Sequence, residues 1–412
     1  MKIRLALTAA LIFLAACERD EITPAKDEPL DPRAIPVLYI WTEDSAPVNS
    51  KTEYVHASFW LYAGPGASFL EEEGEIRGRG NATWNYPKKP YKLRFSNPVS
   101  PFGMPAEKDW VLLAEFCDKS LMRTAYMCGL SELLGMPYTI RYKITEVYLN
   151  GTYEGIYLLA DQVERSGKRI DIGEDGFIIE DDNYWYEEPL SFFSPAGRHY
   201  TFKYPKDIRA EDPSFSFIKS YMEGFEKALQ SEQFRNPETG YRNWIDVPSF
   251  AKWYILFELT GNWEPNLYYV LRDRNAKLEM YPGWDAEWSL GLAYRDNMVS
   301  GWAAPPHAVP VDMPFWSENG YFKRLLLDDY FKDAVREEWL ALCERMPEFE
   351  QRMAAVSGLL LDAQERNFER WPIFDQYPGA TLVVHPSWLE EVAYVSAYFK
   401  ERFKWFGWFL VG

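Results

Sequence analysis

The first of two hydrophobic patterns along the chain predicts β-strands in its amino-terminal half. The run "IPVLYIWTE" at residues 35–43 is rich in β-branched and aromatic residues, as strands are. In "PYKLRF", at residues 90–95, apolar side chains alternate with Lys92 and Arg94. Because successive side chains of a strand point to opposite faces, this alternation places both cations on one face.

A hairpin and one helix complete the prediction for this half. The pair Asn150-Gly151 separates two apolar runs and is the pair that a type I′ hairpin favours. A helical spacing of apolar residues begins near Asp118 or Ser120, either of which can cap a helix, and Gly135 is a plausible stop. We therefore expect residues 36–182 to be mostly antiparallel sheet with one main helix.

The second pattern is a helical period, which dominates the carboxyl-terminal half. Apolar residues recur every three or four positions in residues 250–257, 331–346 and 389–403. One hairpin interrupts them, around residues 273–276. A β-rich part followed by a helical part indicates an α+β fold. We interpret it as two lobes, a β-rich lobe at 36–165 and a mainly helical lobe at 166–412.

The amino terminus, "MKIRLALTAALIFLAAC", has the features of a secretion signal. Two cations precede an apolar run at residues 5–16, which is too short to be a stable membrane span. The run ends in Leu-Ala-Ala-Cys, which resembles a bacterial lipobox. We expect residues 1–16 to be a signal peptide, Cys17 to be lipidated, and residues 17–35 to be a flexible tether. The protein would then be anchored in the bacterial cell envelope, at the outer membrane or cell surface. An ordinary secretion signal followed by a chance cysteine is the alternative.

Composition indicates an acidic globular protein. The 412 residues include 44 Lys and Arg against 62 Asp and Glu, a formal net charge of −18. Such a surface repels nucleic acid and anionic membranes, so we expect no nucleic-acid partner and membrane contact through the lipid anchor alone. The remaining cysteines, Cys117, Cys128 and Cys343, are odd in number. Buried free thiols are therefore expected in preference to a Cys117–Cys128 disulfide.

One stretch runs against this acidity. "EIRGRGNATWNYPKKPYKLRF", at residues 75–95, gathers five cations around a glycine turn: Arg79, Lys88, Lys89, Lys92 and Arg94. A glycine turn lets backbone N–H groups approach an anionic ligand, and neighbouring cations neutralise phosphate charge. A hairpin with solvated charges produces the same pattern, so the pattern alone does not decide between the two.

Two later stretches carry candidate metal ligands. In "YPGWDAEWSLG" one residue separates Asp285 from Glu287, so in an extended segment both carboxylates point the same way. Such a pair suits Mg²⁺, which takes one or two carboxylates together with substrate phosphates. "ELTGNWEPN", at 258–266, carries Asn262, Glu264 and Asn266, which can orient a hydroxyl and complete a metal shell. A solvated acidic turn and an ordinary helix end are the alternatives.

Together these stretches resemble the CotH family of atypical kinases, which are similar to spore coat protein H. The matching stretches are "EIRGRGNATWNYPKKPYKLRF", "DWVLLAEFCDKSLMRTAYM", "VYLNGTYEGIYLLADQVE", "ELTGN" and "PGWDAEWSLG". The resemblance implies a secreted or surface protein with a two-lobed, protein-kinase-like fold. It also implies transfer of phosphate from ATP to protein Ser or Thr hydroxyls with a divalent metal.

The resemblance further implies a role for individual residues. The nucleotide would be held by Arg79, Gly80, Asn81, Lys89, Lys92 and Gln162. Lys92 is the expected phosphate-pairing lysine, with Lys89 and Arg79 as competitors, and Gln162 would lie near the adenine. Glu264 and Asn262 would be catalytic, and Mg²⁺ or Mn²⁺ would be held by Asp285, Glu287 and Asn266.

The chain departs from the family pattern at two positions. Glu264 and Glu287 stand where the family usually has aspartate, and the extra methylene moves each carboxylate by about 1 Å, enough to affect catalysis. Activity is therefore expected to be reduced, altered or absent. If it is lost, the protein would be a surface lipoprotein that binds glycans or proteins. A glycoside hydrolase with a carboxylate pair from Asp285, Glu287, Asp181 or Asp182 is a weaker alternative, because it leaves the basic strand without a role.

Overall fold

The computed structural model describes residues 35–264, 266–293 and 320–411. Its amino-terminal part is a closed barrel of seven strands in the order β1-β2-β3-β4-β5-β7-β6. The barrel closes because β1 pairs in parallel with β6, with Val37 opposite Glu146, whereas the other neighbours are antiparallel. The strands are β1 (Val37–Thr42), β2 (Val55–Tyr62), β3 (Leu70–Gly78), β4 (Tyr91–Val99), β5 (Glu107–Leu113), β6 (Tyr142–Leu149) and β7 (Thr152–Asp161).

The interior of the barrel follows the alternation seen in the sequence. Leu93 of β4 is buried in a core that also contains Phe59 and Trp110, while Arg94 is exposed. The predicted turn between β6 and β7 is confirmed, because Asn150 (φ 50°) and Gly151 (φ 77°) both have the positive φ of a type I′ turn.

A second, antiparallel sheet has the strand order β12-β11-β8-β10-β9. Its central pair joins distant segments, since Leu267 of β11 lies opposite Asp181 of β8. The predicted hairpin near residues 273–276 is confirmed, because it joins β11 to β12. The strands are β8 (Phe177–Asp181), β9 (Ser191–Phe193), β10 (His199–Tyr204), β11 (Leu267–Leu271) and β12 (Glu279–Met280).

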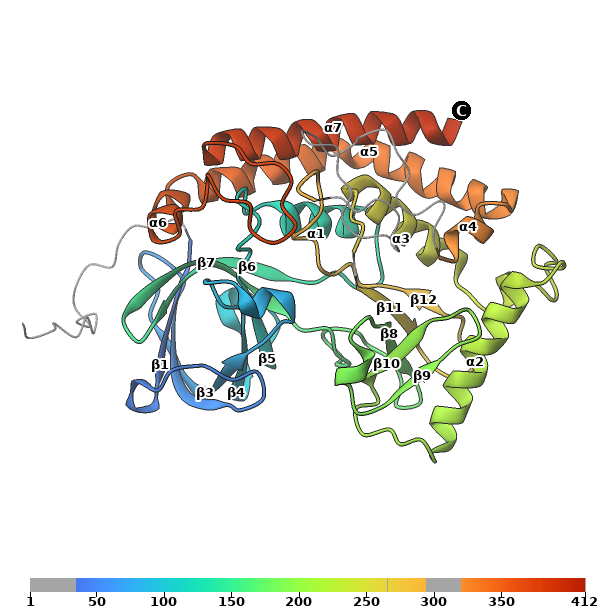
Figure 1. Cartoon of the computed structure of the whole chain (residues 1–412), viewed down its shortest axis with the longest axis horizontal. Helices are drawn as coiled ribbons and strands as arrows, with labels where there is room; N and C mark the ends of the chain where they lie inside the picture. Colours follow the sequence, from blue (N-terminus) through green and yellow to red (C-terminus); the bar gives the residue numbers. More distant parts are fainter. Residues whose placement is uncertain (1–34, 265, 294–319, 412) are drawn as a thin grey trace, which may run out of the picture.

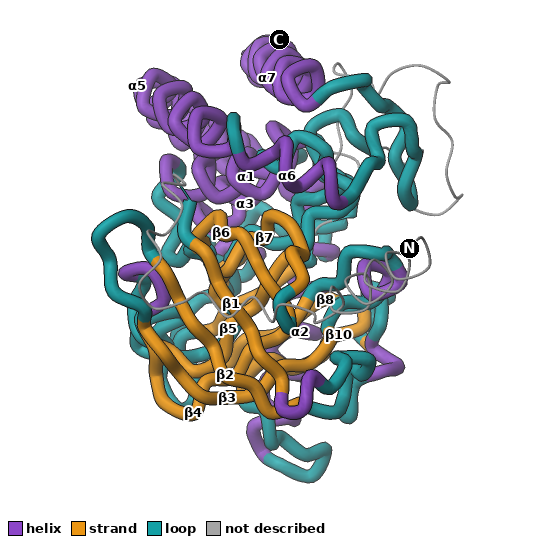
Figure 2. Tube along the Cα trace, turned by 90° about the vertical axis from the view of Figure 1, so that its left-hand side faces the viewer, coloured by secondary structure: helices purple, strands orange, loops and turns teal. Residues whose placement is uncertain are grey.

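A layer of helices lies over one side of both sheets (Figures 1 and 2). The layer contains α1 (Arg123–Leu133), α3 (Val247–Thr260), α4 (Phe322–Leu325), α5 (Asp329–Leu360), α6 (Ala363–Arg370) and α7 (Trp388–Val411), whereas α2 (Pro213–Gln230) lies beside the second sheet. Helix α1 packs against α3 and α5, and α6 packs against β7 of the barrel. Gly135, with φ 62°, follows α1 as predicted. Cys117 and Cys128 are buried free thiols, and Cys343 is a half-buried free thiol.

The prediction of an α+β protein is confirmed, but that of a two-lobed, protein-kinase-like fold with a β-rich and a mainly helical lobe is wrong. The first part is a closed barrel, and a second sheet lies within the part expected to be mainly helical. One continuous core extends from Ile35 to Leu410 and joins the second sheet to the helices, whereas the interior of the barrel forms a separate core. The strands β8 to β12 are short, and the pairing of β8 with β11 joins residues far apart in the chain, which local patterns do not reveal.

The predicted signal peptide, Cys17 and residues 17–34 of the tether lie outside the described residues. The predicted boundary between residues 165 and 166 follows β7 and remains a prediction. In the part of the chain that the structure describes, none of the helices combines the length and apolarity needed to cross a membrane.

Candidate functional site

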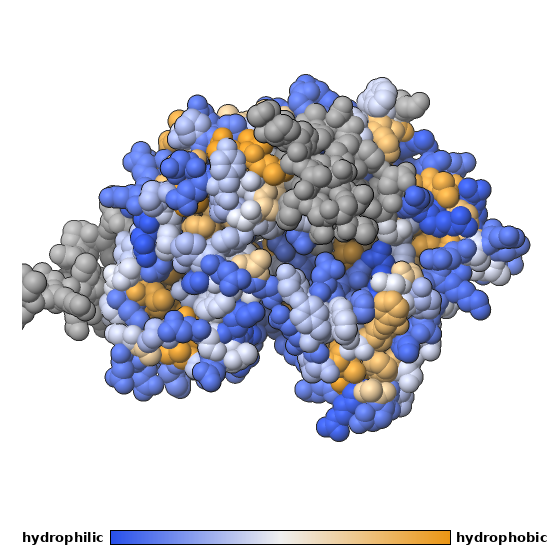
Figure 3. Space-filling view, viewed as in Figure 1, coloured by the Kyte–Doolittle hydropathy of each residue, from blue (hydrophilic) through white to orange (hydrophobic). Residues whose placement is uncertain are grey.

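A cleft of about 360 Å³ lies between the barrel and the second sheet. Its walls come mainly from the loop after β3, the end of β5 and the residues that follow it, the end of β8 and the loop after it, the start of β11 and the residues before it, and the loop after β12. Thr124 and Met127 of α1, Ile140, and Lys203 of β10 also line the cleft. Figure 3 shows the surface hollowed between the barrel and the second-sheet part, with mostly hydrophilic residues on either side. The cleft therefore brings together segments about 200 residues apart in the chain.

The glycine turn after β3 forms one edge of this cleft. Arg79, Gly80 and Asn81 all line it, as predicted for nucleotide-binding residues. Gly80 has φ 86°, and a Cβ atom there would lie 2.2 Å from the Thr83 hydroxyl, so this turn requires glycine. The Arg79 guanidinium lies 5.6 Å from the ring centre of Trp284, on the opposite wall. A half-buried cation of the cleft wall thus lies against an aromatic ring.

Asp285 and Glu287 both line the cleft, but they do not form the parallel pair that an extended segment would give. Residues 281–286 are irregular, and Asp285 has φ 64°, so the alternation of a strand is broken. Glu287 is buried, and its Oε1 accepts a hydrogen bond of 2.6 Å from the backbone N–H of Cys117. Asp285 remains open to the cleft.

Desolvation raises the pKa of both carboxyl groups. The cleft walls raise the pKa of Asp285 to about 6, although its side chain is exposed within the cleft; Arg79 opposes the shift and Glu180 adds to it. Burial raises the pKa of Glu287 to about 7, against the stabilising Cys117 N–H group. The site thus holds carboxylates that lack a full counter-charge.

A third carboxylate, Glu115, was not predicted from the sequence. It follows β5, lines the cleft and accepts hydrogen bonds from the Thr124 hydroxyl at 3.1 and 3.2 Å. Burial, followed by the charge of Glu287, raises its pKa well above the usual value. Its backbone has φ 48°, an uncommon conformation for glutamate. Glu115 lies in the matching stretch "DWVLLAEFCDKSLMRTAYM", but nothing in the sequence singled it out, because only the fold brings it beside Glu287.

The stretch after α3 supplies one structural residue and two cleft residues. Gly261, in the left-handed conformation, ends α3. The buried Asn262 then donates a hydrogen bond of 2.6 Å to the Asp285 carbonyl and accepts one of 3.0 Å from the Glu264 N–H. Asn262 therefore fixes the backbone around Asp285 and does not line the cleft, whereas Glu264 and Asn266 do. Asn266 donates a hydrogen bond to Glu180.

Lys88 is the lysine of the basic stretch that lines the cleft. Its side chain is 1% exposed, and its amine donates to the carbonyl of Ile156 and, at 3.1 Å, to Asn367 Oδ1. Burial lowers the pKa of Lys88 to about 7, although Glu115 and Glu287 oppose the shift. No pattern along the chain favoured Lys88, because five cations are crowded into one stretch.

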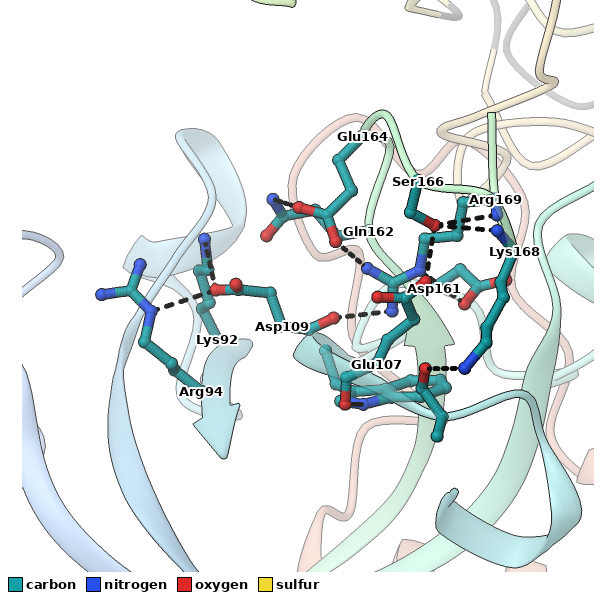
Figure 4. Close-up of polar contacts among 12 residues, drawn as sticks. Lys92, Arg94, Glu107, Asp109, Asp161, Gln162, Glu164, Ser166, Lys168 and Arg169 are labelled. Atoms are coloured by element: carbon teal, nitrogen blue, oxygen red, sulfur yellow. Dashed lines mark hydrogen bonds and ion pairs between the residues drawn. The ribbon is translucent and has the colours of Figure 1, made fainter. Parts of the chain in front are cut away.

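The other lysines predicted to bind nucleotide lie elsewhere. Lys89 donates 2.6 Å to the Trp84 carbonyl, and Lys92 forms an ion pair of 3.1 Å with Asp109 on β5. Figure 4 shows Lys92 and Arg94 directed toward Asp109, with Gln162 beside Glu164. None of Lys89, Lys92 and Gln162 is among the residues that line the cleft. Their expected roles remain predictions, and their placement favours Lys88 as the phosphate-binding lysine.

Asp181 and Asp182, considered as acids of a glycosidase, also line the cleft but have close partners. Asp181 forms an ion pair with Arg198. Asp182 accepts hydrogen bonds from the Tyr184 N–H at 2.7 Å and from the Thr201 hydroxyl at 3.1 Å.

The donor chemistry of the cleft suits Mg²⁺ or Mn²⁺. Among the described residues, no three His, Cys, Asp or Glu side chains form a group that could hold a metal ion. Mg²⁺ does not need such a group, since it binds through one or two carboxylates together with substrate phosphates and water. Asp285 is open to the cleft and supplies an oxygen of the required type, with Glu264 and Asn266 also on the cleft wall.

Comparison with protein families gives one match. The family described as CotH kinase protein matches residues 76–406. This range includes the glycine turn, the cleft acids and the helical layer. Comparison with curated proteins found no match.

Proposed function

The chain belongs to the CotH kinase protein family, and from this premise we propose that it transfers phosphate from ATP to protein Ser or Thr hydroxyls with Mg²⁺ or Mn²⁺ in the cleft. The observation that carries the proposal is the convergence of distant segments on one cleft: Arg79, Gly80 and Asn81 on one wall, and Asn266, Asp285 and Glu287 on the other. Phosphoryl transfer depends mainly on positioning and charge, which such a cleft can supply.

Each wall has a distinct part in this proposal. The Gly80 turn lets backbone N–H groups approach the phosphates, and Arg79 and Lys88 contribute positive charge. Asp285 would hold the metal ion, which when bound neutralises phosphate charge. Asn262 keeps the Asp285 backbone in place through its 2.6 Å hydrogen bond. Glu264, exposed at the cleft, would accept the proton of the acceptor hydroxyl.

The proposed location is the bacterial cell envelope, with Cys17 lipidated and residues 1–16 removed. The motif Leu-Ala-Ala-Cys supports this proposal. An acidic protein in that location would be kept at the membrane by its lipid, since its charge repels anionic headgroups.

The proposal is tested by calorimetry of ATP binding with and without Mg²⁺ or Mn²⁺, and by transfer of labelled γ-phosphate to a degenerate library of Ser- and Thr-containing peptides. Asp285→Asn should abolish metal-dependent ATP binding, because it removes the carboxylate proposed to hold the metal ion. Asp207→Asn, at an exposed position on the loop after β10, is the matched control. Glu287→Asp should preserve transfer or increase it.

Two results would contradict the proposal. If Asp285→Asn binds ATP and metal as the wild type does, the cleft is not a metal–nucleotide site. If the wild type binds neither, the protein is better described as a surface protein that retains the family fold and binds glycans or proteins.

A further inference from the structure

Lys88 contacts a residue that lies far from it in the sequence. Its amine lies 3.1 Å from Oδ1 of Asn367, 279 residues later, and 4.8 Å from the ring centre of Tyr157. It also donates to the carbonyl of Ile156. Because the side chain of Lys88 is buried, these groups define where its positive charge lies along the cleft wall.

Asn367 is built into this position from α6. Its side chain is 2% exposed, and the same Oδ1 atom accepts a second hydrogen bond, of 3.0 Å, from the Ile156 N–H group. The neighbouring Gly155 has φ 97°, and a Cβ atom there would lie 2.6 Å from Asn367 Oδ1 and 3.3 Å from Lys88 Cε. The glycine thus leaves the room in which the lysine and the asparagine meet.

Contacts made by other residues attach α6 to the hairpin formed by β6 and β7. Arg366 forms an ion pair of 2.8 Å with the buried Glu146, and Trp371 donates a hydrogen bond of 2.9 Å to the Glu154 carbonyl. Arg366 and Trp371 make these contacts with Glu146 and Glu154, whereas the hydrogen bond from the Lys88 amine goes to Asn367. Docking of α6 and the hold on Lys88 can therefore be perturbed independently.

We propose that Asn367 is a positioning residue, which directs the Lys88 amine toward bound nucleotide and so links α6 to the cleft wall that holds the phosphates. The inference rests on the proposed function, in which Lys88 contributes charge to the phosphates. A neutral amide oxygen can accept a hydrogen bond from the ammonium group without cancelling its charge. A carboxylate at this position would instead compete with the phosphate for the lysine.

The surroundings of Lys88 give this contact a measurable consequence. Glu115 follows β5, Glu287 follows β12 and Glu154 lies on β7, and all three favour the charged amine, while burial disfavours it. The Tyr157 ring lies beside it. Asn367 accepts a hydrogen bond from the amine, so its removal should lower the pKa of Lys88 further.

The test compares Asn367→Ala, Asn367→Asp and Arg366→Ala in the full chain. Each variant is labelled with lysine carrying ¹³C at Cε, and the Lys88 signal, identified by its loss in Lys88→Arg, is titrated with pH without nucleotide. ATP binding is measured by calorimetry in Mg²⁺. Arg366→Ala is the control, because it weakens docking of α6 and leaves Asn367 in place.

Asn367→Ala should lower the Lys88 pKa and weaken ATP binding about tenfold, as expected for loss of a hydrogen bond to a charged group. Asn367→Asp, which keeps an acceptor oxygen and adds a charge, should raise the Lys88 pKa above that of the wild type. Arg366→Ala should lower thermal stability without either change.

An unchanged Lys88 titration in both Asn367 variants would overturn the inference, as would an equal shift in Arg366→Ala. If Asn367→Ala does not fold, the Asn367→Asp titration decides alone. Failure of the proposed function would give a different result in these two measurements. In that case wild-type protein binds no ATP with Mg²⁺, while the Lys88 titration still shows whether Asn367 sets the state of the amine.

Discussion

Replacing Glu287 by glutamine should stabilise the protein above pH 7 in the absence of metal. Glu287 is 8% exposed and lies near Glu115 and Asp285. Burial raises its pKa from 4.5 to about 7, so the folded state disfavours the ionised carboxylate. Glutamine keeps the oxygen that accepts the Cys117 N–H and removes the charge. The substitution therefore isolates the electrostatic effect.

The magnitude and its pH window follow from this pKa. A rise from 4.5 to about 7 corresponds to about 3 kcal/mol of lost stability once Glu287 is ionised, as an upper limit. Between pH 4.5 and 7 the folded state binds more protons than the unfolded state, so stability falls as pH rises through this range. Because Glu115 shares the repulsion, we expect a gain of about 1–2 kcal/mol for Glu287→Gln at pH 8 and almost none at pH 4.5.

Urea unfolding at both pH values, in EDTA, measures this difference. Glu344→Gln, at an exposed position on α5, is the control and should change stability by less than about 0.5 kcal/mol at either pH. A variant that is no more stable than the wild type at pH 8 would refute the reasoning. An equal gain at both pH values would also refute it, since the effect would not then depend on ionisation.

Three further predictions address the lysines, the amino terminus and the helical layer. Lys88→Ala should weaken ATP binding in calorimetry by at least about tenfold, while Lys92→Ala should change it by less than about threefold; the reverse order would return the phosphate role to Lys92. Mass analysis of mature protein from membranes should find a lipid on Cys17, and an unmodified Cys17 in the membrane-free fraction would refute lipidation. Arg402→Ala should destabilise the fold by about 3–5 kcal/mol in urea unfolding, because the buried Glu258 carboxylate lies 2.6 Å from Arg402 and would lose this partner. A loss below about 1 kcal/mol would contradict this reading of the pair.

The elements that the sequence predicted well are those set by neighbours along the chain. The β6–β7 turn depends on Asn150 and Gly151 alone, and α5 and α7 show a long apolar period. Closure of the barrel depends instead on Val37 meeting Glu146, and the second sheet on Leu267 meeting Asp181. Each of these contacts joins residues that no local pattern relates. The fold class could thus be predicted, whereas the architecture could not.

The residues of the site also fall into those that short motifs revealed and those whose surroundings only the fold shows. The resemblance to the family led to Arg79, Gly80, Asn81 and Asp285, because these residues stand in specific short motifs, and all four line the cleft. Strand alternation favoured Lys92 over Lys88, because it predicts on which face of β4 a side chain lies. It does not show which side chains of β5 lie next to that face. Asp109 on β5 pairs with Lys92, so the lysine expected to pair with phosphate already has a partner.

The charge of the residues that line the cleft contradicts the first explanation of the basic stretch at residues 75–95, in which its cations neutralise the phosphate charge. Nine carboxylates line the cleft (Glu115, Glu180, Asp181, Asp182, Glu187, Glu188, Glu264, Asp285 and Glu287), against the cations Arg79, Lys88 and Lys203. Lys203 is already 2.7 Å from Glu180. A basic cradle would bind ATP in EDTA, whereas this cleft would repel four negative charges unless a cation accompanied them. Divalent metal would therefore be needed for ATP to bind, before any transfer, and the lysine and arginine would orient phosphates whose charge is largely neutralised by the metal.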